Sequence, residues 1–184
     1  MLIPAKGVTL KSGKEVILKS PKPDDAQALL NHLKNVFNQS YQNMNHPKNN
    51  WENFPVEEEA KILTDFASSP SKFMISAFDG ERIVGNLGCF GMGGEFLKFN
   101  ARIGMGLDYD FHNVGLGTEL LNYAIQKAKE NKIHRLELTV RTFNEPGIAL
   151  YEKTGFRRVG ILKETAFIDE KFCDEYMYEM LIGQ

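Results

Sequence analysis

Two glycines in front of an amphipathic helix are the residues of this sequence best suited to hold an anion. They lie in the run LDYDFHNVGLGTELL, residues 107–121, where an extended segment meets a short loop at Gly115 and Gly117. Glycine lacks a Cβ atom, so the backbone can turn sharply there and lie close to a ligand. Apolar residues then recur at helical spacing, at Leu116, Leu120, Leu121, Ala124 and Ala128. Because the first N–H groups of a helix have no helical partner and carry the positive end of its dipole, the loop is a candidate anion site.

Several glycine loops use this physics, and the neighbouring residues distinguish them. The phosphate-binding pattern GxxxxGK[ST] is excluded because no lysine follows Gly117. The dinucleotide pattern GxGxxG is only half present, with Leu120 at its third glycine position. The loop is similar instead to (Gln/Arg)-x-x-Gly-x-(Gly/Ala), the loop of the GNAT superfamily of N-acetyltransferases, with His112 in place of Gln or Arg.

A second block in the correct order strengthens this resemblance. The run NEPGIALYEKTGF, residues 144–156, resembles the family segment N-x-x-A-x-x-x-Y-x-x-x-G-F. Its local chemistry agrees with a helix: Asn144 can cap it, Pro146 suits its first turn, and Gly155 can end it. The resemblance extends from about Lys14 to Leu181 and is sharpest over residues 101–156.

The resemblance implies acetyl-CoA as cosubstrate, in a cleft where two neighbouring strands splay apart. It implies that Leu107 and Tyr109 offer backbone groups to the pantetheine arm, that Asn144 hydrogen-bonds the coenzyme arm, and that His112 lies beside the phosphates. The N–H groups implied to hold the pyrophosphate are those of Val114, Gly115, Leu116, Gly117 and Thr118. From the residues alone, an ordinary strand-to-helix turn with glycines for close packing remains an alternative.

Tyr151 occupies the position of the family tyrosine that protonates the departing coenzyme A thiolate. A phenol has a reference pKa of ~10 and is therefore protonated at neutral pH, as a general acid must be. The alternative is a core aromatic residue three positions after Ile148 on a buried helix face.

The group that accepts a proton from the acceptor amine is harder to assign. An alkylamine has a reference pKa of ~10.4 and must lose a proton before it attacks a thioester. Asp108 is the best side-chain candidate, with water as the relay; Asp110, Glu95 and Glu137 are weaker, and solvated charges at a strand end are the alternative for both aspartates. No cysteine or serine nucleophile with a partner base is visible, which favours direct transfer.

The elements that would position these residues begin with a hairpin and two helices. Val8–Leu10 and Glu15–Lys19 are predicted strands, residues 20–24 start a helix that continues to Phe37, and Pro55 opens a second helix that stops at residues 68–70. The polar stretch Asn38–Phe54 between them carries four apolar or aromatic residues, Tyr41, Met44, Trp51 and Phe54. We expect it to be an ordered wall of a substrate cleft rather than a flexible linker.

Strands dominate the rest of the chain. Predicted strands cover Lys72–Phe78, Glu81–Phe90, about Phe96–Tyr109, His134–Arg141, Arg157–Leu162, Thr165–Ile168 and Glu175–Ile182. The order is strand, two helices, three strands, helix, strand, helix and two strands. This is the GNAT order, an α/β fold around a mixed, mostly antiparallel sheet that is splayed at the acetyl-CoA cleft.

Composition limits the remaining possibilities. A length of 184 residues with 42% hydrophobic content predicts one domain, which the resemblance identifies as a GNAT domain over residues 1–184. A net charge of −2 gives no basic footprint for nucleic acid, and no run approaches the ~20 apolar residues of a membrane helix, so a cytoplasmic protein without membrane or nucleic-acid partners is expected. Cys89 and Cys173 are read as reduced thiols. The four histidines are scattered without metal-ligand spacing, and no metal is predicted.

These features together predict an N-acetyltransferase that moves acetyl from acetyl-CoA to a primary amine. The tail, residues 157–181, loosely resembles the branch of ribosomal-protein N-terminal and polyamine acetyltransferases. The acceptor therefore stays open between a small molecule, a polyamine and a protein N-terminus, and a homodimer is common in the family. Two alternatives remain: a catalytically silent acyl-CoA-binding module and a nucleotide-binding α/β protein.

Overall fold

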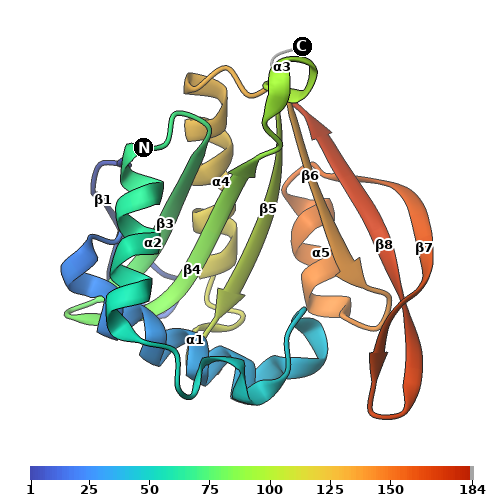
Figure 1. The fold of residues 1–184 in the computed structure, drawn as a ribbon, viewed down its shortest axis with the longest axis horizontal. Helices are drawn as coiled ribbons and strands as arrows, with labels where there is room; N and C mark the ends of the chain where they lie inside the picture. Colours follow the sequence, from blue (N-terminus) through green and yellow to red (C-terminus); the bar gives the residue numbers. More distant parts are fainter. Residues whose placement is uncertain (183–184) are drawn as a thin grey trace.

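The computed structural model describes residues 1–182 as a sheet of eight strands with helices on both faces (Figure 1). The strands are β1 Lys6–Thr9, β2 Glu15–Lys19, β3 Lys72–Asp79, β4 Arg82–Gly91, β5 Asn100–Leu107, β6 Arg135–Arg141, β7 Arg157–Ile168 and β8 Lys171–Leu181. The α-helices are α1 Ala26–Ser40, α2 Val56–Ser68, α3 Gly94–Leu97, α4 Leu116–Glu130 and α5 Glu145–Lys153. Within residues 1–182, no helix is long and apolar enough to cross a membrane.

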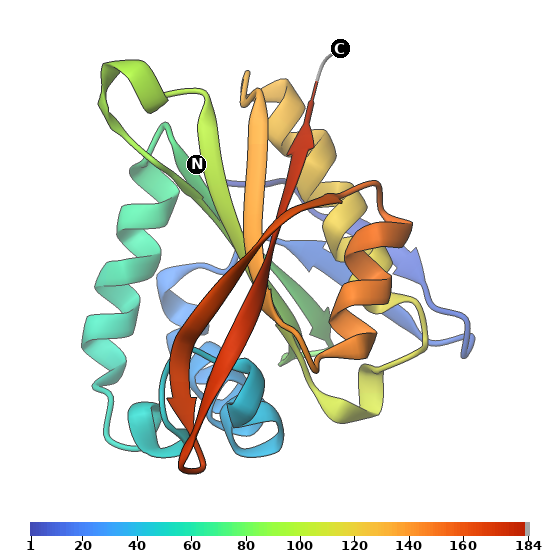
Figure 2. The same cartoon turned by 90° about the vertical axis from the view of Figure 1, so that its right-hand side faces the viewer.

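The helices form two layers around the sheet. Figure 2 shows α1 and α2 on one side of the sheet and α4 and α5 on the other. The α4 side holds the larger core, in which Leu116, Leu120 and Leu121 are fully buried. On the opposite side, Leu29 of α1 and Leu63 of α2 pack against the sheet in a second cluster. The predicted apolar faces of these helices are therefore the faces that they bury.

The strand order is β1-β2-β3-β4-β5-β6-β8-β7, and each neighbouring pair is antiparallel except β5 and β6. Those two strands run parallel and share only three residue pairs, from Asn100↔Arg135 to Arg102↔Glu137. Beyond Arg102 they diverge (Figure 1). The mixed, mostly antiparallel and splayed sheet predicted from the sequence is confirmed.

The strand predicted over Phe96–Tyr109 was wrong at both ends. Gly93 and Gly94 have φ values of 70° and 71°, and this turn sends the chain into the short helix α3 before β5 begins at Asn100. Phe96 is 96% exposed, so its apolar character gave a false strand signal. At the other end, Tyr109 starts a 3₁₀ turn, Tyr109–Phe111, which leads into the glycine loop.

The terminal strands are longer than predicted. β7 runs from Arg157 through Ile168, with pairing to β8 interrupted between Leu162 and Ala166, so the two expected strands are one irregular strand. β8 begins at Lys171, because the reversal needs only Asp169 and Glu170, both with positive φ.

The segment Asn38–Phe54 is ordered into short turns. α1 continues to Ser40, and 3₁₀ turns follow at Tyr41–Asn43 and Lys48–Trp51. The Trp51 ring packs edge-on against Phe37 at 5.9 Å and against Phe54 at 5.0 Å between ring centroids. These aromatic contacts fix the segment across the open end of the splay.

Candidate active site

A cavity of about 370 Å³ lies where β5 and β6 separate. It is lined from both sides of the sheet, by Val36 and Ser40 of α1 and by Tyr151 of α5. The cavity therefore reaches through the sheet at the splay. The glycine loop contributes His112, Asn113, Gly115, Gly117 and Thr118 to its lining, and β5 contributes Met105, Gly106 and Leu107.

The loop geometry explains both glycines. Gly115 is the N-cap residue of α4 and has φ 94°, a left-handed conformation that strains other residues. A Cβ atom on Gly117 would lie 2.8 Å from Leu150 Cδ2 and 3.3 Å from Leu107 Cδ1. Gly115 thus permits the turn, and Gly117 permits close packing of α4 against β5 and α5.

The first turn of α4 supplies free donors to this cavity. The N–H of Glu119 is the first to bond within the helix, to the Gly115 carbonyl at 3.1 Å. The N–H groups of Leu116, Gly117 and Thr118 precede it and have no helical acceptor. The side chain of Leu116 is fully buried in the core, so only its backbone could serve a ligand. Val114 does not line the cavity; its carbonyl accepts a hydrogen bond from Lys11 N–H at 3.0 Å, which ties the loop to the β1–β2 turn.

Two cations at the cavity were missed by the sequence analysis. Lys11 reaches the loop from the β1–β2 turn, with its Cγ 3.6 Å from the position of a Cβ on Gly115, and Lys153 lies in the last turn of α5. Lys153 could have been noticed two residues after Tyr151. Nothing in the sequence connects Lys11 to a loop about a hundred residues away.

Free donors, a backbone that can be approached closely and two lysines are together suited to a diphosphate. The residues present therefore fit the phosphates of a coenzyme A ester.

Of the two residues predicted to contact the pantetheine arm, only one lines the cavity. Leu107 lines the cavity, and its carbonyl oxygen contacts His112 Nε2 at 3.1 Å. Tyr109 lies outside the cavity lining: its N–H donates to Gln39 Oε1 at 2.9 Å, and its ring stacks on His112 at 4.8 Å. His112 thus braces the loop between these two residues while facing the cavity.

Helix α5 contributes two of the predicted residues. Asn144 caps the helix, with Oδ1 accepting the Gly147 N–H at 3.1 Å, and also lines the cavity. A Cβ on Gly147 would lie 2.8 Å from Asn144 Nδ2, so this glycine makes room for the cap. Tyr151 faces the cavity about two turns after Asn144 and packs against Phe156 and Tyr178. Burial raises the pKa of Tyr151 to about 12, which keeps the phenol protonated at neutral pH.

Asp108 lies apart from this group. Its carboxylate is buried, with Oδ1 2.8 Å from His32 Nδ1 and Oδ2 accepting a bond from Arg82. Burial alone raises the pKa of Asp108, but its hydrogen bonds to His32 and Arg82 and the charge of His32 outweigh it, so the pKa is lowered. This cluster borders a second depression between α1 and the β3–β4 turn and does not line the cavity.

The weaker candidates do not line the cavity either. Glu137 is buried between Arg102 and Arg135; burial raises its pKa, but the two arginines outweigh this and lower it. Glu95 is in the exposed helix α3, and Asp110 is exposed in the turn before the loop. Of the predicted site residues, those that the structure gathers around the cavity are Leu107, His112, Gly115, Gly117, Thr118, Asn144 and Tyr151, whereas Val114 and Leu116 do not line it.

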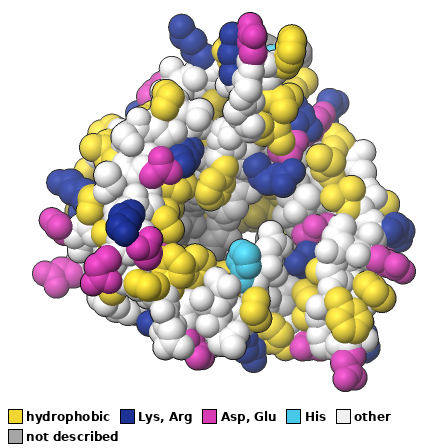
Figure 3. All heavy atoms as spheres, viewed as in Figure 1, with side chains coloured by type: hydrophobic (Ala, Val, Ile, Leu, Met, Phe, Trp, Pro, Cys, Tyr) yellow, Lys and Arg dark blue, Asp and Glu magenta, His cyan; other side chains and the backbone are white. Residues whose placement is uncertain are grey.

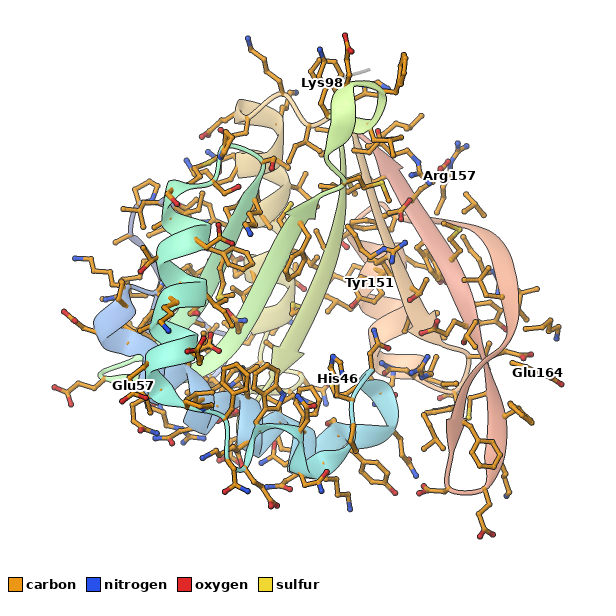
Figure 4. All side chains as sticks on the ribbon, viewed as in Figure 1. His46, Glu57, Lys98, Tyr151, Arg157 and Glu164 are labelled. Carbon is orange, nitrogen blue, oxygen red and sulfur yellow. The ribbon has the colours of Figure 1, made fainter. Side chains whose placement is uncertain are left out.

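The α1 side of the splay forms the other mouth of the cavity. Asn43 and Met44 line it, and Figure 3 shows the face hollowed beside a histidine. Figure 4 identifies this position as His46, below the divergence of β5 and β6. The His46 ring lies 6.4 Å from that of Phe37 in a stacked arrangement. Sequence analysis recognised this stretch as a wall but gave His46 no position in it.

Known proteins resemble this chain in sequence and in fold. A sequence model of the acetyltransferase (GNAT) family matches residues 30–156. A probable N-acetyltransferase of Bacillus subtilis, YjcK, is 27% identical over 134 residues, which cover 70% of this chain and 74% of that protein. A GNAT-family acetyltransferase from Streptococcus pneumoniae superposes with a TM-score of 0.86 at 28% identity, covering 91% of this chain and 99% of that one.

The fold is also shared at much lower identity. The structure of yncA, a putative acetyltransferase from Salmonella typhimurium with its cofactor acetyl-CoA, has a TM-score of 0.79 at 10% identity and covers 92% of this chain and 95% of that one. The family match spans more than half of the chain, and its two motif blocks form the walls of one cavity. The chain therefore belongs to the GNAT family and is an acetyl-CoA-dependent N-acetyltransferase.

Proposed function

We propose that this enzyme transfers the acetyl group of acetyl-CoA to a primary amine by direct attack of the amine on the thioester. The observation that carries the proposal is one cavity, open on both sides of the sheet, that contains the glycine loop, Asn144 and Tyr151. The donor enters from the α4–α5 side and the amine from the α1 side, so the two substrates meet at the splay.

The donor is held chiefly by backbone groups. The N–H groups of Gly115, Leu116, Gly117 and Thr118 receive the pyrophosphate, with Val114 as the fixed start of the loop, and Lys11 and Lys153 add positive charge. Beyond Arg102, the edge of β5 that is no longer paired with β6, including Leu107, offers strand groups to the amides of the pantetheine arm. Asn144 contributes from the start of α5, and Tyr109 is assigned no contact because its N–H is bonded to Gln39.

In the reaction, the neutral amine attacks the carbonyl carbon, a C–N bond forms and the C–S bond breaks. Tyr151 donates a proton to the departing sulfur, and the amine loses a proton to solvent at the α1-side mouth. A phenol with a pKa of about 12 releases its proton only as negative charge develops on the sulfur. Tyr151 therefore acts first as a hydrogen-bond donor to the thiolate and then as its acid.

The side chains support direct transfer rather than an acetylated enzyme. Within residues 1–182, neither cysteine lines the cavity. Cys89 is fully buried, and burial raises the pKa of its thiol to about 12, so it is not available as a thiolate. Asp108 is assigned a structural role, because its carboxylate is committed to His32 and Arg82.

Thermal unfolding with acetyl-CoA, coenzyme A, NAD and ATP in parallel tests the donor site. A ligand at about a hundred times its dissociation constant adds ~2.7 kcal/mol to stability. We expect a clear upward shift with both coenzyme forms and little with NAD or ATP, followed by thiol release when an amine is supplied. A shift with NAD or ATP alone would identify a nucleotide-binding protein, and binding without thiol release for any amine would identify a silent acyl-CoA-binding module.

A further inference from the structure

A patch of bare backbone lies at the centre of the sheet on the α1 side. Gly104 of β5 is paired directly with Gly88 of β4, and Gly106 follows two residues later on the same face as Gly104. A Cβ on Gly106 would lie 2.9 Å from Val36 Cγ1, which identifies this face as the one covered by α1. We call Gly88, Gly104 and Gly106 the glycine floor.

Glycine weakens a strand interior, and it often marks a place where a ligand approaches the backbone closely. Two of the three positions are already occupied by neighbours: the Phe90 ring lies over Gly88 and Val36 lies over Gly106. Gly104 is exposed, and a Cβ built on it would meet no atom within 4 Å. The open space of the glycine floor is therefore above Gly104, on the amine side of the splay.

A positively charged cluster adjoins this space at the end where β5 and β6 are still paired. It contains Arg102, Arg135, Arg157, Glu137 and Glu179, so three arginines face two glutamates and one positive charge is in excess. Figure 4 shows Arg157 beside the upper part of β8, at this closed end.

Arg102 is the member of the cluster nearest to Gly104. It precedes Gly104 by two residues, which places the two on the same face of β5 about 7 Å apart along the strand. Its Nε and Nη2 donate to Glu137 Oε1, and its Nη1 has no partner within residues 1–182. The side chain is 58% exposed, so a guanidinium N–H remains available.

The same face offers little to a polycation. On β6 and β8 its carboxylates are Glu137, Glu179 and Glu175, and each is paired with an arginine; Glu175 bonds Arg141 and Thr139. A polyamine needs uncommitted carboxylates, whereas an acceptor with a carboxylate of its own would meet the excess positive charge.

We propose, on the basis of the proposed function, that the acceptor is an amino acid whose carboxylate is bound by Arg102 and whose carbon skeleton lies on Gly104. Its amine, which is bonded to the same carbon as the carboxylate, then lies above Gly104 on the side that faces the splay, where the thioester arrives. Arg102 and Gly104 are specificity-determining residues: one selects the carboxylate and the other leaves room for the skeleton.

A thiol-release assay with matched acceptors tests whether the enzyme recognises the carboxylate of the acceptor. L-Leucine and other amino acids are compared with isoamylamine, which lacks the carboxylate, and with spermidine and a tripeptide. We expect kcat/KM to be at least 10-fold higher for the preferred amino acid than for its matched amine. Arg102→Gln should reduce this ratio toward one by raising KM with kcat little changed. Arg158→Gln, at an exposed arginine stacked on Tyr176, is the control and should leave the ratio intact.

Substitution of Gly104 in the glycine floor tests whether the carbon skeleton of the acceptor lies there. Gly104→Val should fold normally, because its Cβ has space and valine favours strands, yet reduce kcat/KM for the amino acid at least 10-fold. Gly160→Val, at an equally open glycine of β7, is the control and should leave turnover unchanged. The stability gained with acetyl-CoA should be the same in both variants and in the wild type.

The inference would be overturned by a preference for spermidine, for the tripeptide or for the bare amine, or by equal activity of Gly104→Val and Gly160→Val. Failure of every amino acid to release thiol, with acetyl-CoA still stabilising the protein, would also overturn it. Absence of stabilisation by acetyl-CoA would instead contradict the proposed function, so the two failures are distinguishable.

Discussion

The neighbours of Tyr151 set the pKa of its phenol. A phenol is protonated at neutral pH in water, and packing against Phe156 and Tyr178 extends that protonated range by raising the pKa to about 12. The same packing places the ring as a core aromatic residue would be placed. The two interpretations of this residue from the sequence are therefore compatible, since burial of the ring as a core aromatic residue also keeps the phenol protonated, as the proposed reaction requires.

Replacement of this hydroxyl isolates its contribution. Tyr151→Phe keeps the ring and its packing, so we expect turnover to fall about 100-fold, in the range for a lost general acid. The shift in unfolding temperature with acetyl-CoA should stay nearly unchanged. Steady-state thiol release measures the first and thermal unfolding the second, and an unaltered kcat would remove Tyr151 from the mechanism.

Asp108 shows the opposite case, in which a residue near the motif serves the fold. Its carboxylate joins α1, through His32, to the start of β4, through Arg82. Because its pKa is lowered in the folded protein, it contributes stability above its unfolded pKa of ~3.9, and this contribution is lost as pH falls through the lower folded value.

Asp108→Asn should therefore destabilise the protein by about 3 kcal/mol at neutral pH, because it leaves His32 and Arg82 without their buried anion. The variant should also lose less stability than the wild type on acidification below about pH 4. Denaturant unfolding across pH measures both effects. The pH–rate profile of the remaining activity should keep its shape; loss of the acidic limb, which reports protonation of a general base, would restore Asp108 to that role.

At the scale of elements, the two glycines of the loop serve different purposes: one allows a backbone conformation and the other allows close packing. Gly115 needs its left-handed φ, whereas Gly117 needs the absence of a side chain beside Leu150 and Leu107. The loop, the end of β5 and the second half of α5 are thus fitted to one another, and the proposed donor site depends on that fit.

Gly117→Ala should push α4 away from α5, since its Cβ would lie 2.8 Å from Leu150 Cδ2. We expect a loss of about 1–2 kcal/mol in stability and roughly 10-fold weaker acetyl-CoA binding. Gly7→Ala, at a β1 glycine with open space around it, provides the matched control. Titration of acetyl-CoA by calorimetry compares the two, and equal affinities would show that the close approach at Gly117 is unimportant.

Elements with strong periodicity could be predicted from the sequence, and contacts between distant elements could not. The apolar periods of α1, α2 and α4 and the two motif blocks were sufficient to predict the helices, the splayed sheet and one wall of the site. Phe96 misled the strand prediction because exposed aromatic residues look like buried ones in a sequence. The partner of Asp108 lies 76 residues away and Lys11 comes from another hairpin, so neither contact leaves a local signal.

At the scale of the molecule, the 38–54 segment closes the open end of the splay. Tyr41 Oη and Gln42 Nε2 donate to Asp169 Oδ2 at the β7–β8 turn, at 2.7 and 2.8 Å. Arg141 of β6 donates to the carbonyl of Met44 at 3.2 Å. These bonds connect α1 on one side of the splay with β6, β7 and β8 on the other.

Asp169→Ala should release one end of this connection. Exposed hydrogen bonds contribute little to global stability, so the free energy of unfolding should change by less than about 1 kcal/mol. Backbone amides of residues 41–54 should exchange with solvent faster, which hydrogen–deuterium exchange measures directly. Unchanged exchange in that segment would show that its aromatic contacts alone hold it.

The three residue pairs between β5 and β6 also have a kinetic consequence. They join strands 35 residues apart in sequence, and such non-local parallel pairing forms late in folding. In the proposed complex acetyl-CoA lies beside this junction, so we expect its contacts to be made after the rate-limiting step of folding and to be lost before unfolding can proceed. The coenzyme should accordingly lengthen the lifetime of the native enzyme while leaving its refolding rate almost unaltered, so that its cellular concentration regulates how slowly the enzyme is lost.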